Sequence, residues 1–79
     1  MVVSIKKLKT NYEVRYDYSR LLTEYIKTFP REHQTTRVDN VVMPDGSTKE
    51  DWVRIVRDVQ IGSLLVFLID NGIEFKLEN

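Results

Sequence analysis

The chain has 79 residues, with 12 basic and 12 acidic side chains, a formal net charge of zero and no cysteine. This length accommodates one domain, 1–79, and the lack of cysteine excludes disulfides and thiolate metal sites and favours a reducing, cytoplasmic location. The longest apolar run, 64–69, is too short to span a membrane, and lysines follow the first apolar residues, so we expect neither a targeting segment nor a membrane partner.

The first elements predicted along the chain are two paired strands. Apolar and charged side chains alternate from Tyr12 to Tyr18, which is typical of a half-buried strand. The segment Val2–Leu8 can pair with this strand through a turn at Lys9–Asn11. We therefore expect a hairpin at the amino end.

A helix is predicted after Ser19, where the apolar period changes. One helical stripe is formed by Leu21, Leu22, Tyr25, Ile26 and Phe29. Either Asp17 or Ser19 can cap its start, and Pro30 ends it. The polar residues 31–36 are expected to form a loop.

The middle of the chain combines a clear turn with an ambiguous segment. Arg37–Met43 resembles a strand that leads into the turn Pro44–Ser47. Thr48–Val59 is either the second arm of this hairpin, which its β-branched and aromatic residues slightly favour, or a helix that starts with Ser47 and Glu50 spaced as a capping box. In both cases Gly62 and Ser63 are expected to open or interrupt the helix that follows.

An apolar helix and a final strand are predicted at the carboxyl end. The apolar residues Leu64–Ile69 precede Asn71–Gly72, a typical helix stop. After it, Ile73, Phe75 and Leu77 alternate with charged residues and share one face. The whole pattern predicts an α+β domain, a small antiparallel sheet packed on one face by two helices.

No catalytic or metal-binding constellation is visible in the sequence. The single histidine, His33, lies in a polar loop without a second ligand at a metal-site spacing, and Ser47 and Ser63 have no neighbouring base. The adjacent carboxylates Glu50 and Asp51 follow an exposed turn, which is not the environment of a catalytic acid–base pair, and their place near a helix start explains them better. We expect no enzyme, no cofactor and no metal.

The distribution of charge along the chain suggests binding of nucleic acid instead of catalysis. Residues 1–37 contain eight basic and four acidic side chains, and residues 38–79 contain four and eight. A basic surface beside planar side chains can bind nucleic acid, although folding can interleave the two halves. The regular spacing of Tyr12, Tyr16, Tyr25 and Trp52 favours core positions for these aromatic residues. The predicted DNA contacts are Arg31, His33, Arg37, Lys49, Trp52, Arg54 and Arg57.

Two stretches resemble the HARP domain, the HepA-related module of annealing helicases and of some phage helicase-like proteins. The first half is carried by 12–22 and 26–31, which match an alternating strand, a short amphipathic helix and a hydrophobic-Pro-basic step. In the second half, the Trp-containing strand of the family resembles Trp52–Val56. The helix and final strand that follow it resemble 64–72 and 73–75. This chain has an insertion at 38–51 before them. A helical Thr48–Val59 would remove the correspondence of Trp52.

The resemblance implies DNA-structure binding that supports an annealing or translocating motor, without catalysis in this module. By this resemblance, the expected DNA contacts are Arg31, His33, Trp52 and Arg54. The alternative is a small phage or bacterial regulator that binds a protein or forms a homodimer through the edge strand Ile73–Leu77. Zero net charge favours this alternative, and Glu74 and Glu78 can guard the edge against unspecific pairing.

Overall fold

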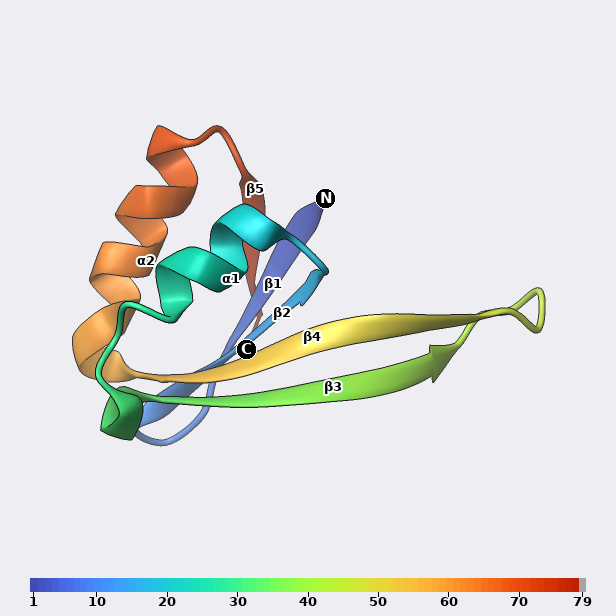
Figure 1. Cartoon of the computed structure of the whole chain (residues 1–79), viewed down its shortest axis with the longest axis horizontal. Helices are drawn as coiled ribbons and strands as arrows, with labels where there is room; N and C mark the ends of the chain where they lie inside the picture. Colours follow the sequence, from blue (N-terminus) through green and yellow to red (C-terminus); the bar gives the residue numbers. More distant parts are fainter. Residues whose placement is uncertain (79) are drawn as a thin grey trace.

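The computed structural model describes residues 1–78 and shows an α+β fold with a five-stranded mixed sheet (Figure 1). The elements are β1 (Val2–Lys7), β2 (Asn11–Asp17), α1 (Arg20–Ile26), the 3-10 turn η1 (Arg31–His33), β3 (Gln34–Val42), β4 (Thr48–Arg57), α2 (Asp58–Asp70) and β5 (Glu74–Glu78). The strand order is β3-β4-β2-β1-β5.

The sheet is not antiparallel throughout, because β5 pairs with β1 in the parallel orientation. The other three pairs are antiparallel, including the predicted β1–β2 hairpin. Since α2 returns the chain to the end of the sheet where β4 began, β5 runs in the same direction as β4 and therefore as β1. The prediction of two helices on one face is confirmed (Figure 1).

The core lies between this face and the helices. Its fully or nearly buried residues are Val3, Ile5, Val14, Tyr16, Leu22, Ile26, Phe29, Val56, Leu64 and Leu68. The aromatic residues Tyr12, Tyr25 and Trp52 pack against them, so the interpretation of these side chains as part of the core is confirmed. No helix within residues 1–78 covers the opposite sheet face.

The predicted helix after Ser19 is present but shorter than its apolar stripe. The Ser19 hydroxyl accepts a hydrogen bond from the backbone N–H of Leu22 at 3.3 Å, so Ser19 is the cap. The helix ends at Ile26, before Pro30. Leu21, predicted in the buried stripe, is 52% exposed, because in so short a helix the sheet covers only the side that carries Leu22 and Ile26.

The ambiguous segment Thr48–Val59 is a strand up to Arg57, and it pairs with both β2 and β3. The helix α2 then begins at Asp58 and runs through Gly62 and Ser63, so the predicted opening or interruption there is wrong. Glycine costs a helix about 1 kcal/mol. The burial of Leu64 and Leu68 against the sheet outweighs that cost.

The segment 31–36, predicted as a loop, contains η1 and the first residues of β3. Polar side chains at Gln34–Thr36 do not prevent strand formation here, because β4 offers partners from Val56 to Arg54. The predicted turn after β3 is confirmed, with Gly46 at a φ of 88°. The β3–β4 hairpin projects beyond the rest of the molecule (Figure 1).

Candidate nucleic-acid interface

The uncovered face of the sheet carries an ion-pair network centred on Arg15. Its guanidinium nitrogens lie 2.9 Å from a carboxylate oxygen of Glu13, 3.2 Å from Asp39 and 3.3 Å from Asp51. The hydrogen bond to Glu13 is the main cause of the raised pKa of Arg15. Because Arg15 belongs to the basic half of the sequence and two of its partners to the acidic half, folding interleaves the two halves on this face.

Two of the predicted DNA contacts, Arg37 and Lys49, belong to the same network. Arg37 donates hydrogen bonds to both carboxylate oxygens of Asp39, at 2.7 and 3.1 Å, which raises the pKa of Arg37 and lowers that of Asp39. Lys49 Nζ lies 3.4 Å from Asp51 and 3.4 Å from Asp17, and the hydrogen bond to Asp51 raises its pKa. A phosphate would have to compete with these carboxylates.

Arg54 and Trp52 point to the helix-covered side. Arg54 is only 4% exposed; its Nη1 donates to Gln34 Oε1 at 3.2 Å and to the Thr36 hydroxyl, and its buried Nε has no hydrogen-bond partner among the described residues. Trp52 is half-buried beside Tyr18, with 5.1 Å between ring centroids. The burial of Arg54 does not fit its predicted role as a phosphate contact.

The remaining predicted contacts meet at one end of the sheet. There the β1–β2 turn, η1 and the β4–α2 junction lie next to one another (Figure 1). We define the basic end as Lys7, Lys9, Arg31, His33 and Arg57. The ion pairs found within residues 1–78 involve none of these side chains, and the acidic residues of the same segments are Glu32 and Asp58.

Backbone and side-chain hydrogen bonds hold the three segments of the basic end together. The N–H of Asp58 donates to the carbonyl of Thr10 at 3.2 Å, which joins the start of α2 to the β1–β2 turn. The Nε2 of Gln60 and the Nδ1 of His33 are 3.0 Å apart, which joins α2 to η1. Hydrogen bonds therefore connect the three segments that carry the cationic side chains of the basic end.

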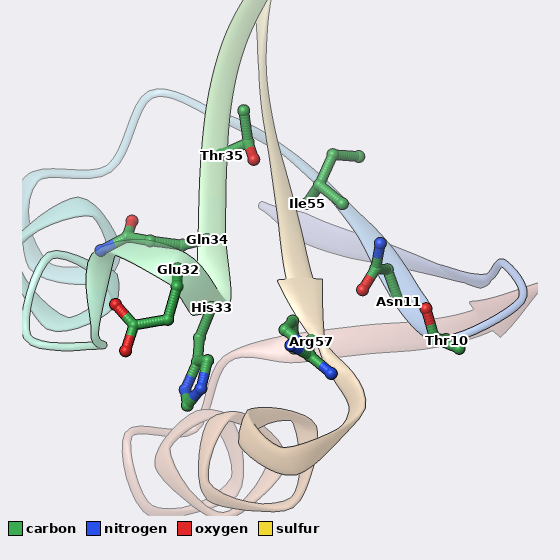
Figure 2. Close-up of a pocket in the computed structure, with 8 residues that line it drawn as sticks. All are labelled: Thr10, Asn11, Glu32, His33, Gln34, Thr35, Ile55 and Arg57. Carbon is green, nitrogen blue, oxygen red and sulfur yellow. The ribbon is translucent and has the colours of Figure 1, made fainter.

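A polar hollow of about 320 Å³ is lined in part by His33 and Arg57 of the basic end. Figure 2 shows Arg57 between His33 on one side and Thr10 and Asn11 on the other. The complete lining is Thr10, Asn11, Glu32, His33, Gln34, Thr35, Ile55 and Arg57. Hydroxyl, amide and guanidinium groups dominate it, so it offers hydrogen-bond donors to an anionic oxygen.

Sequence reasoning placed only part of this site. The predicted contacts do not include Lys7 and Lys9, although the predicted hairpin places Lys7 near the end of its first strand and Lys9 in its turn. The missing information was the pairing of β2 with β4, in which Asn11 lies opposite Arg57. This register brings the turn beside Arg57, and no local pattern specifies it.

Residues 1–78 contain no group of three or more His, Cys, Asp or Glu side chains suited to holding a metal ion. Within the same residues, neither helix has the length and apolarity needed to cross a bilayer. In comparisons with known proteins, no family model, curated protein or solved structure matches this chain. The candidate site therefore depends on its geometry alone.

Proposed function

We propose that this protein binds DNA without catalysing a reaction, through phosphate contacts at the basic end. One observation carries the proposal: four cationic side chains outside any ion pair of the described chain come from three separate segments to one end of the sheet. Neutralising phosphates releases counterions, which supplies most of the affinity of sequence-independent binding.

The site has donors of two kinds, and each has its own task. The ammonium and guanidinium groups of Lys7, Lys9, Arg31 and Arg57 meet phosphate oxygens as charges. Neutral groups in the hollow, such as the amide of Asn11 and the hydroxyl of Thr35, add hydrogen bonds that fix the position of the backbone. Neither kind of contact reads a base, so the site recognises the backbone and its shape.

The HARP resemblance supports the same proposal from a different direction. Its second half requires Trp52 to lie on a strand, and Trp52 does lie within β4. On this resemblance we propose that the chain acts as an accessory to a helicase or annealing motor that processes DNA structures. The cysteine-free composition supports a cytoplasmic site of action.

Fluorescence anisotropy with a labelled forked DNA, at several salt concentrations, tests the proposal. Arg31→Gln and Arg57→Gln should each weaken binding about three- to tenfold, similarly for forks of different sequence, and should each lower the salt slope by about one. Arg20→Gln is the matched control, because Arg20 is exposed at the start of α1, away from the basic end. It should leave the affinity nearly unchanged.

A further substitution distinguishes between the basic end and the uncovered sheet face as the DNA-binding site. Arg37→Gln removes a cation that is already paired with Asp39, so it should change affinity much less than Arg57→Gln. If Arg37→Gln weakens binding more than the two changes at the basic end, the DNA site lies on the sheet face instead. If no variant changes a measurable affinity, neither surface is the site.

A specific observation also favours the protein-binding alternative. β5 is a sheet edge, since it pairs only with β1 among the described strands, and exposed apolar residues of α2 lie beyond the core. We propose as a second function that this edge binds protein by adding a strand. Slower amide exchange in Glu74–Glu78 on addition of a strand-forming peptide would support it, and unchanged exchange would refute it.

A further inference from the structure

Exposed apolar side chains of α2 lie next to the edge strand β5. The helix α2 carries apolar side chains on its outer side as well as on its buried side: Leu64 and Leu68 are buried, whereas Val66 and Ile69, which share the outer side with Ser63 and Asp70, are 57% and 64% exposed. Soluble helices usually present a polar outer face to water, and a helix that is apolar all round is usually covered. Nothing within residues 1–78 covers the outer face of α2.

The edge strand extends this surface. Leu77 lies opposite Ile5, which places it on the helix-covered face of the sheet, yet it is 66% exposed. A hollow of about 560 Å³ between the end of α2 and β5 is lined mainly by apolar side chains, among them Ile69, Ile73 and Phe75. A strand added at this edge would cover the exposed side chains of both elements.

We propose that the occupant is a second copy of this chain, with β5 pairing antiparallel to β5 across a two-fold axis at Phe75. This inference rests on the second function proposed above, that the β5 edge binds protein. The two sheets then join into one. The axis also brings the carboxyl-terminal parts of the two α2 helices to the same side of the joined sheet, where Ile69 and Leu77 become buried.

Charge complementarity supports this partner and this register. With the axis at Phe75, Glu74 lies opposite Lys76 of the partner subunit, and the pair occurs twice. Leu77 lies opposite Ile73 of the partner subunit on the helix-covered face. Opposite charges at directly facing positions of an antiparallel pair are favourable, and like charges are unfavourable.

The neighbouring registers are worse. An axis at Lys76 places Lys76 opposite its own copy and Glu74 opposite Glu78 of the partner subunit, so every charged pair is repulsive. An axis at Glu74 places that carboxylate opposite its own copy. An axis at Leu77 pairs Lys76 with Glu78 of the partner subunit, but it leaves Ile73 without a facing residue, whereas the axis at Phe75 places Ile73 opposite Leu77 of the partner subunit. The charges of the edge therefore oppose the axes at Lys76 and Glu74, and the axis at Phe75 combines attractive charge pairs with an apolar contact on the helix-covered face, which suits a specific dimer.

Sedimentation velocity of the full chain over a wide concentration range tests the dimer. The wild-type chain should convert from monomer to dimer as concentration rises. Glu74→Lys and Lys76→Glu should each raise the dissociation constant about tenfold, because each turns two attractive pairs into two repulsive ones. The double variant Glu74→Lys/Lys76→Glu should restore dimerisation, because it reverses the polarity of both pairs.

Two controls make the result specific. Lys27→Glu changes the net charge as Lys76→Glu does, but Lys27 caps the end of α1, far from β5 in the chain, so this variant should dimerise like the wild-type chain. Hydrogen exchange at low and high concentration should show added protection in Glu74–Glu78 and none in the other edge strand, β3. Protection confined to β3, or a double variant no better than the single ones, would overturn the proposed register.

A chain that stays monomeric at every concentration would overturn the self-association. Hydrogen exchange of that monomer with an added peptide then tests the more general proposal that the β5 edge binds a strand. If a synthetic peptide of alternating valine and threonine slows exchange in β5 of that monomer, the edge binds strands but not its own copy. If the peptide has no effect either, both the dimer and strand capture at this edge are refuted.

Discussion

Replacing Arg15 by glutamine should lower the free energy of unfolding by about 1–2 kcal/mol at neutral pH and low salt. The guanidinium contacts Glu13, Asp39 and Asp51 at 2.9, 3.2 and 3.3 Å, with side chains 12–32% exposed. Solvent-screened pairs contribute about 0.2–1 kcal/mol each, and one guanidinium cannot satisfy three carboxylates fully, so we take the middle of the summed range. The variant also leaves these carboxylates facing one another.

Urea unfolding followed by the fluorescence of Trp52 measures the change. In about 1 M salt, where the screening length is about 3 Å, the difference between the variant and the wild-type chain should fall clearly. Lys27→Gln is the control, because its contact with Glu24 is 3.8 Å long and both side chains are about 60% exposed. It should change stability by no more than about 0.5 kcal/mol. An Arg15→Gln effect that is absent, or equally large in high salt, would refute the reasoning.

Two further predictions concern acid stability and the core. The pKa of Asp39 is lowered in the folded chain, chiefly through its hydrogen bonds from Arg37. The ionised carboxylate therefore adds to the free energy of unfolding. This contribution is complete above the unfolded pKa of about 3.9 and is lost as the pH falls through the lower folded pKa. The stability difference between the wild-type chain and Asp39→Asn, from urea unfolding across pH 2–7, should therefore shrink in acid; a constant difference would contradict this. Leu64→Ala should cost about 2–5 kcal/mol, whereas Val66→Ala, at a site 57% exposed, should cost less than about 0.5. Thermal melts compare the two variants, and equal costs would contradict the placement of α2.

Local patterns were sufficient for the amino-terminal elements. The alternation from Tyr12 to Tyr18 specifies a half-buried strand whichever strand it pairs with, and Ser19 carries its own capping hydroxyl. The turn at Pro44–Ser47 is equally local, since Gly46 supplies the positive φ that the turn requires. These features depend on residues within a few positions of each other, so the sequence states them directly.

Long-range pairing decided the elements that the sequence left ambiguous or misplaced. Thr48–Arg57 has both a helical and a strand pattern, and it becomes a strand because β2 and β3 pair with its two sides. The same pairing extends β3 back to Gln34. Gly62 remains inside α2 because burial of its apolar neighbours outweighs the helical cost of glycine.

The candidate sites show the same division. The composition and the distribution of charge along the chain indicated basic side chains as candidates for phosphate binding. The sequence does not distinguish basic residues that are buried or paired from those that stay unpaired. Folding buried Arg54, paired Arg37 with Asp39, and left Arg57 beside the β1–β2 turn outside any ion pair of the described chain. The sequence by itself determined which side chains could carry charge and which strands could form. Only the tertiary structure decided which charges stay unpaired, because the distances between residues far apart in the chain depend on strand register.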